Sequence, residues 1–128
     1  MANTVDIQTI EDGPRNLVVR VYLASDGVTG DISNQVIVDA STLNGVPDTL
    51  KLVHCMAQLS GFTALLKWDA TTDDELLHLS DGQNEYEMYD FGGIPNPKST
   101  GYTGDVMIDT TGFTAAGDNG SIVLEFHK

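Results

Sequence analysis

The stretch GYTGDVMIDTTGFTAAGDNGSIVLEFHK, Gly101–Lys128, indicates most clearly which fold class this chain adopts. Its first run, GDVMID, sets Val106 and Ile108 on one face. Its last run, SIVLEFH, does the same with every second residue from Ile122 to Phe126. An apolar residue at every second position is typical of a half-buried β-strand. The intervening AAGDNG is rich in residues that tolerate positive φ, so the stretch predicts two strands joined as a hairpin.

The same period of two extends back through the rest of the chain. Alternating runs occur in NLVVRVYL, NQVIVDAS, LKLVHCMAQLS and LLKWDA, with shorter ones in TVDIQTI, LLHLS and NEYEMYDF. Only DASTLNGVPDTL and TTDDELLHLS could each hold a helical turn. About nine short strands with no helices between them predict an all-β fold. We expect an antiparallel β-sandwich of eight or nine strands, with a jelly-roll connectivity as an open alternative.

The strand pattern also predicts the core and the domain organisation. Residues 1–15 are expected to form an N-terminal arm or first strand, and residues 16–128 the β-sandwich domain. Inward-facing positions follow from the alternation within each run. These predicted core residues are Leu17, Val19, Val21, Val38, Val53, Cys55, Leu66, Trp68, Val106, Ile108, Ile122, Leu124 and Phe126.

Charge and cysteine content exclude several kinds of partner. The 128 residues carry 19 acidic and 6 basic side chains, a formal net charge of −13. Nucleic acid and anionic membrane surfaces are bound through Lys and Arg, so neither is an expected partner. The single cysteine, Cys55, allows no intramolecular disulfide, and MANTVDIQTIEDGPR lacks the basic and apolar regions of a signal peptide. We therefore expect synthesis and folding in the cytoplasm.

Catalytic and metal-binding patterns are not found in the sequence. His54, His78 and His127 fall in three different predicted strands, and no HExxH, CxxC or GxSxG motif occurs. Cys55 lies in an apolar register and is interpreted as a core residue. The acidic loops DGVTGD and DATTDDE are open to two interpretations, a calcium site or solvated turn acids. The sequence predicts no catalytic residue, no cofactor and no metal, so we do not expect an enzyme.

Two segments are candidates for contacts with a partner. The first is YEMYDFGGIPNPKSTGYTG, whose aromatic residues and two prolines suit either a contact loop or a crossover between sheets. The second is the N-terminal segment, which is apolar enough to lie along a neighbour's sheet edge as an added strand. The candidate contact residues are Val5, Ile7, Ile10, Tyr86, Tyr89, Phe91, Pro95, Pro97 and Tyr102.

Four motifs together resemble those of a known family. GPRNLVVRVYL, DATTDDELLHL, FGGIPNP and the C-terminal stretch quoted first are similar to small virion proteins of tailed bacteriophages, over residues 13–128. The resemblance implies a virion structural protein without catalytic residues. The expected function is a capsid decoration, or cement, protein that binds the major capsid protein on the outside of the icosahedral head. A homo-oligomer, specifically a trimer, is the expected assembly.

Alternative functions stay open at this point. Small acidic β-proteins of virions also serve as neck, tail or fibre components, and an adhesin-like domain of the virion could bind a host glycan. A binding domain of non-viral origin is a further alternative. Copy number per virion separates a decoration protein from a neck or tail component.

Overall fold

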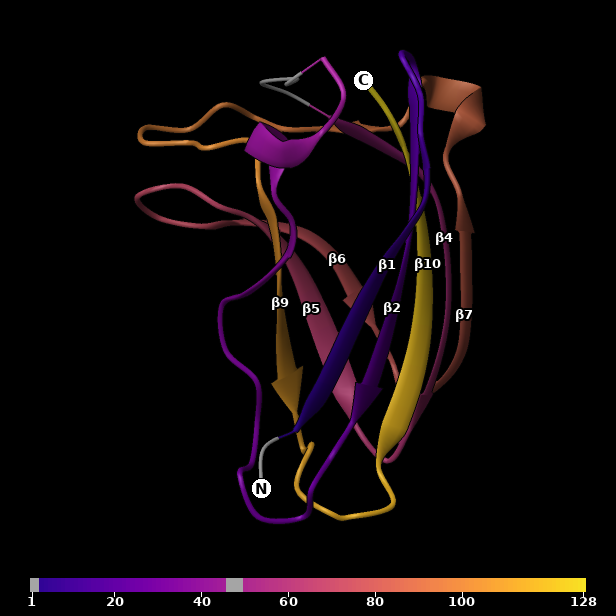
Figure 1. Ribbon diagram of the computed structural model, residues 1–128, viewed down its shortest axis with the longest axis vertical. Helices are drawn as coiled ribbons and strands as arrows, with labels where there is room; N and C mark the ends of the chain where they lie inside the picture. The colour runs from indigo at the N-terminus through magenta and orange to yellow at the C-terminus, as the bar shows by residue number, and fades with distance from the viewer. Residues whose placement is uncertain (1–2, 46–49) are drawn as a thin grey trace.

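The computed structural model describes residues 3–45 and 50–128 of the chain, and nearly all of its regular structure is β (Figure 1). Strands account for 55% and helix for 5% of the structure, which confirms the all-β prediction. The strands are β1 (Thr4–Asp12), β2 (Asn16–Ala24), β3 (Gln35–Val38), β4 (Lys51–Ser60), β5 (Thr63–Trp68), β6 (Asp74–Leu79), β7 (Gly82–Glu87), β8 (Ile94–Pro95), β9 (Val106–Thr111) and β10 (Asn119–His127). Two short 3₁₀ helices complete the set, η1 (Ala40–Thr42) and η2 (Tyr89–Phe91).

The strands form two antiparallel sheets with jelly-roll connectivity. One sheet has the order β1-β2-β10-β4-β7, with β8 also paired to β4, and the other has the order β3-β9-β5-β6. With β1 and β8 set aside, the first of the remaining eight strands pairs with the last (β2 with β10), and β3 pairs with β9. The third then pairs with the sixth (β4 with β7), and β5 pairs with β6. This nested pairing is that of a jelly roll, so the structure confirms the sandwich and selects the jelly-roll alternative.

The predicted hairpin at the C-terminal end is wrong, because β9 and β10 belong to different sheets. The segment between them crosses from one sheet to the other and closes one end of the core. Phe113 in this segment is fully buried and meets Phe62 edge to face, with ring centroids 4.5 Å apart. Its backbone N–H donates to Asp31, and Asp118 accepts from the N–H groups of Thr114 and Ala115. Burial of an aromatic ring and capping of its turn therefore favour a crossover over a hairpin.

Predictions for three other short segments agree with the structure to different degrees. DASTLNGVPDTL does contain a helical turn, η1, although its residues 46–49 lie outside the described part of the chain. TTDDELLHLS forms the strand β6 and no helical turn. Asn119 and Gly120, expected at the end of the AAGDNG turn, are the first two residues of β10.

The core lies between the two sheets, and all thirteen predicted core residues are buried. Twelve of them belong to one continuous apolar cluster, and Val53 is the exception. The register between β4 and β10 shifts between Glu125 and Phe126, because Leu52 pairs with Phe126 while His54 pairs with Glu125. Leu52 therefore takes the inward position that the alternation assigns to Val53, and Val53 is buried next to Gly93 of the segment between η2 and β8.

Candidate functional site

The N-terminal segment is an edge strand of its own sheet. β1 pairs antiparallel with β2 of the same chain, with Val5 opposite Leu23 and Ile7 opposite Val21. Val5 packs against the core, whereas Ile7 is 39% exposed. Ile10 lies at a register shift between Thr9 and Glu11 and is 55% exposed. The structure therefore shows a strand already paired on one side, and not an extended arm.

An apolar groove lies beside this edge, between β1 and the region of β3 and η1. Its volume is about 200 Å³. The lining residues are Ile7, Thr9, Val19, Val36, Ile37, Val38, Asp39, Thr42 and Leu43. Within the described residues no strand pairs with the other side of β1. The groove and the unpaired edge together form a surface that we name the β1 edge.

The crossover after β7 carries the second set of predicted contacts. It leaves β7 of one sheet and ends at β9 of the other, and η2 is the orange coiled ribbon at the upper right of Figure 1. Within η2, Phe91 is 67% and Tyr89 48% exposed. The segment is thus a crossover that also presents exposed aromatic rings.

The remaining predicted contacts are spread along the same crossover. Tyr86 on β7 donates from its hydroxyl to the carbonyl oxygen of His78, at 3.4 Å. Pro95 lies in β8 opposite Lys51, and Tyr102 is held by an N–H···O bond to Ser99. Pro97 is exposed, between β8 and that turn.

The structure does not bring the two predicted sets together. β1 forms one edge of the larger sheet and β7 the other, with β2, β10 and β4 between them. The two sets are therefore two separate candidate surfaces.

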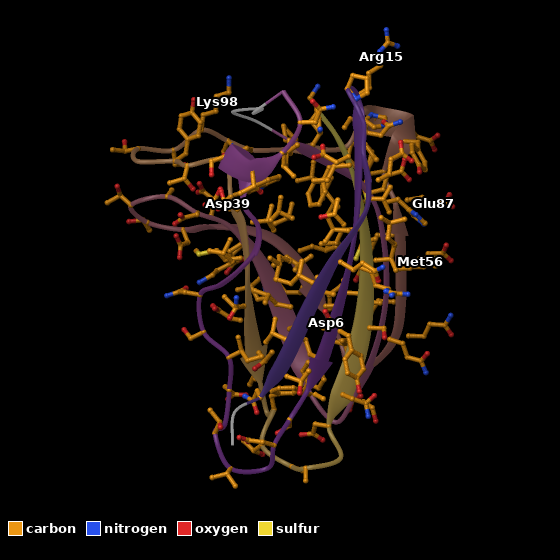
Figure 2. The ribbon with its side chains drawn as sticks, viewed as in Figure 1. Asp6, Arg15, Asp39, Met56, Glu87 and Lys98 are labelled. Atoms are coloured by element: carbon orange, nitrogen blue, oxygen red, sulfur yellow. The ribbon has the colours of Figure 1, made fainter. Side chains whose placement is uncertain are left out.

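A polar surface that the sequence analysis did not identify lies on the outer face of the larger sheet. Residues in register across the strands form rows on this face, and one row runs Asp6, Tyr22, Ser121, Gln58 and Gln83. Met56 and Glu87 also lie on the side turned away from the smaller sheet (Figure 2). A shallow pocket of about 200 Å³ opens here, lined by Met56, Ala57, Gln58, Gln83, Asn84, Glu85, Ser121 and Val123.

In each alternating run, the residues between the inward-facing apolar positions could have been assigned to an outer surface. Sequence alone gives neither the strand order nor the register that align those residues into rows.

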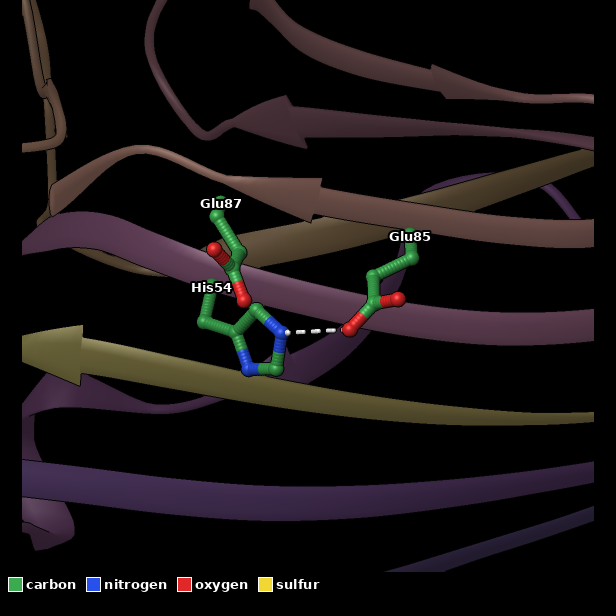
Figure 3. Close-up of side chains that lie close together, drawn as sticks. All are labelled: His54, Glu85 and Glu87. Carbon is green, nitrogen blue, oxygen red and sulfur yellow. Dashed lines mark hydrogen bonds and ion pairs between the residues drawn. The ribbon is translucent and has the colours of Figure 1, made fainter. Parts of the chain in front are cut away.

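The histidines take three different environments. His54 on β4 lies beside Glu85 and Glu87 of β7, with 3.3 Å between His54 Nε2 and Glu85 Oε2 (Figure 3). His78 is far more exposed and lies 3.7 Å from Glu75 on its own strand. His127 has its ring 6.4 Å from that of Tyr89.

Acidic side chains in the two loops accept hydrogen bonds from neighbouring groups of the same chain. Hydrogen bonds from Thr29 and from the backbone N–H of Val28 lower the pKa of Asp26 to about 2. Asp73 accepts from the N–H of Ala70 and pairs with Lys67 at 3.2 Å, and the first of these contacts lowers its pKa the most. These contacts favour the interpretation as turn-capping acids.

Cys55 is unsuited to nucleophilic chemistry. Its side chain is fully buried in the core, and this burial raises the pKa of its thiol to about 12. The thiolate is the reactive form of cysteine, so the residue is inert near neutral pH.

No protein-family model matches this chain, and no curated protein sequence is significantly similar to it. Among the described residues, no helix is long and apolar enough to cross a membrane.

Proposed function

We propose that this chain is a non-catalytic structural protein of a bacteriophage virion, a decoration protein that binds the major capsid protein on the outside of the head. The observation that carries the proposal is the β1 edge. It combines a strand whose outer side pairs with no other strand of the described residues, an adjacent apolar groove and the exposed side chains of Ile7 and Ile10. Exposed apolar surface of this kind marks interaction sites, and an open sheet edge accepts an added strand from a partner.

Charge on β1 indicates which partner strand would fit. Asp6, Glu11 and Asp12 give this strand only acidic ionisable side chains, and the register shift at Ile10 interrupts its pairing. Both features discourage the edge from pairing with a second copy of itself. A capsid strand or loop carrying Lys or Arg would be attracted to it, because opposite charges steer association and set specificity.

The net charge of −13 supports a position outside the shell. Packaged DNA would repel a protein of this charge, whereas the outer surface imposes no such cost. We propose a homotrimer at or near the three-fold positions, because a subunit bound there meets symmetry-related neighbours. Size-exclusion chromatography with light scattering gives the mass of the free protein, and a monomer would remove the trimer from the proposal.

Binding to undecorated shells tests the β1 edge directly. Ile10→Asp places a charge on the edge at an exposed position, so we expect an unchanged urea midpoint and a strong loss of shell occupancy. Val28→Asp is the matched control, since Val28 is 86% exposed in the loop between β2 and β3. Full occupancy by the Ile10→Asp protein would refute docking through this edge.

A second candidate function, recognition of a host glycan, is favoured by the outer-face pocket. Its Gln58, Gln83, Glu85 and Ser121 side chains are donors and acceptors suited to sugar hydroxyl groups, and Met56 and Val123 add apolar contact. Binding of the protein to host polysaccharide, lost on Gln58→Ala and Gln83→Ala but kept on Ile10→Asp, would support an adhesin. A copy number near a dozen per virion would instead indicate a neck or tail component, since only the shell offers hundreds of equivalent sites.

A further inference from the structure

Three side chains with metal-binding groups converge on the outer face of the larger sheet. His54 lies directly opposite Glu87 across the β4–β7 pair, and Glu85 lies two residues along the same face. Their ligand atoms all lie within 4.8 Å of one another. Figure 3 shows the three side chains close together. Within residues 3–45 and 50–128, no other three His, Cys, Asp or Glu side chains meet in this way.

The spacing of these atoms fits a tetrahedral ion. Ligands at about 2.1 Å from Zn²⁺ lie about 3.4 Å from one another in that geometry. The separation between His54 Nε2 and Glu85 Oε2 is 3.3 Å, so this pair already matches. Glu87 is exposed, and its carboxylate lies beside the imidazole, so rotation of its side chain completes the set.

The imidazole of His54 also has an aromatic neighbour that helps to position it. The ring of Tyr89 is stacked near that of His54, with centroids 6.1 Å apart and planes inclined by 28°. The Tyr89 hydroxyl donates to Glu125 Oε1 at 2.5 Å, which fixes that ring in turn. Ring stacking occupies neither nitrogen of His54, so the imidazole is oriented while Nε2 stays directed at Glu85 (Figure 3).

We propose that His54, Glu85 and Glu87 bind a divalent first-row transition metal ion, with Zn²⁺ as the preferred ion. One imidazole and two carboxylates are ligands that Zn²⁺ accepts, whereas Ca²⁺ and Mg²⁺ prefer all-oxygen sites. A cation also relieves the repulsion between two neighbouring carboxylates. Three protein ligands leave a coordination position for water. The inference goes beyond the decoration role and does not depend on it.

The spacing of residues along the chain could not reveal this site. His54 and Glu85 are separated by 31 positions, and only the pairing of β4 with β7 places them side by side. The absence of a linear metal motif is therefore compatible with the site.

Zn²⁺ titration of the purified full chain, after treatment with chelator and dialysis, tests the proposal. We expect one equivalent bound per chain, and a Kd at least about tenfold weaker for His54→Ala and for Glu87→Gln, since tenfold corresponds to 1.4 kcal/mol. His78→Ala is the matched control. It removes an imidazole that also faces a glutamate, Glu75, but has no second carboxylate in its group. The control should bind as the unmodified chain does.

A second measurement needs no substitution. Addition of Zn²⁺ to the unmodified chain should shift the ring-nitrogen NMR signals of His54 and leave those of His78 unchanged. Co²⁺ bound at the same site should give visible ligand-field absorption that Zn²⁺ displaces. Equal Zn²⁺ affinity in the unmodified and His54→Ala chains, or equal loss in His78→Ala, would show diffuse binding to an acidic surface and overturn the proposal.

Discussion

Replacement of Phe126 by alanine tests the central packing of the jelly roll. Phe126 is fully buried near the end of β10, opposite Leu17 of β2 and Leu52 of β4. Its ring meets Trp68 of the other sheet edge to face, with centroids 6.4 Å apart, so one side chain links both layers. Phe→Ala in a closed core costs about 3–5 kcal/mol, from lost burial and from the cavity left behind.

We expect the full cost at this position although it lies only two residues from Lys128. The N–H of Lys128 donates to the carbonyl oxygen of Arg15 at 2.8 Å, and its ammonium group pairs with Asp12. These contacts hold the end of β10 in place, so fraying should not absorb the loss.

Urea titration followed by circular dichroism gives the free energy of unfolding. A loss of about 3–5 kcal/mol corresponds to a fall in Tm of roughly 10–20 °C for a domain of this size. Phe91→Ala is the matched control, because the same atoms are removed from a ring that is 67% exposed, and we expect a change within about 0.5 kcal/mol. A loss under about 1 kcal/mol for Phe126→Ala, or equal losses for both variants, would refute this account of the core.

Three further predictions concern a turn, a strand glycine and an ion pair. The pKa of Asp26 is lowered to about 2, so the stabilisation by its carboxylate is present above pH 4 and is lost between about pH 4 and pH 2. The difference in urea midpoint between the unmodified chain and Asp26→Ala should therefore shrink over that pH range. A difference that stays constant would contradict this role of Asp26. Gly120→Ala places a Cβ 2.6 Å from Leu59 Cδ2, so the free energy of unfolding should fall by about 1–3 kcal/mol. The Cβ of Gly117→Ala meets nothing within 4 Å, so this control variant should be nearly as stable as the unmodified chain. Lys67 Nζ lies 3.2 Å from Asp73 Oδ2 and 2.8 Å from Asp109 Oδ2. Lys67→Met removes this ammonium group and should lower the free energy of unfolding, measured by thermal unfolding, by about 1–3 kcal/mol. No loss would mean that the two ion pairs do not stabilise the fold.

The strands and the core were predictable because the chain alternates so regularly. Period-two runs such as that of β10 place large apolar residues on one face, and a sandwich or a barrel is needed to bury nine or so such faces without helices. Errors arise where one residue changes the register. The shift in β4 brings Leu52 into the cluster between the sheets and buries Val53 outside that cluster, next to Gly93, and no local sequence signal marks it.

Surfaces built from several strands were not predictable from the sequence. The hairpin expected before β10 fails because burial of Phe113 favours a crossover between sheets, which is a tertiary effect. The meeting of His54 with Glu85 depends on strand order, which the sequence does not state. The position of the η2 rings in a connection between strands, by contrast, was predictable from the Pro- and Gly-rich composition around them.

Electron cryomicroscopy of the virion tests the proposed function most directly. We expect a jelly-roll density repeated over the outer surface of the head, near its three-fold positions, with β1 against the major capsid protein. A map that places the chain in a single ring at the neck or tail would contradict the decoration role. A map with the chain on the shell but with β1 turned to solvent would contradict docking through the β1 edge.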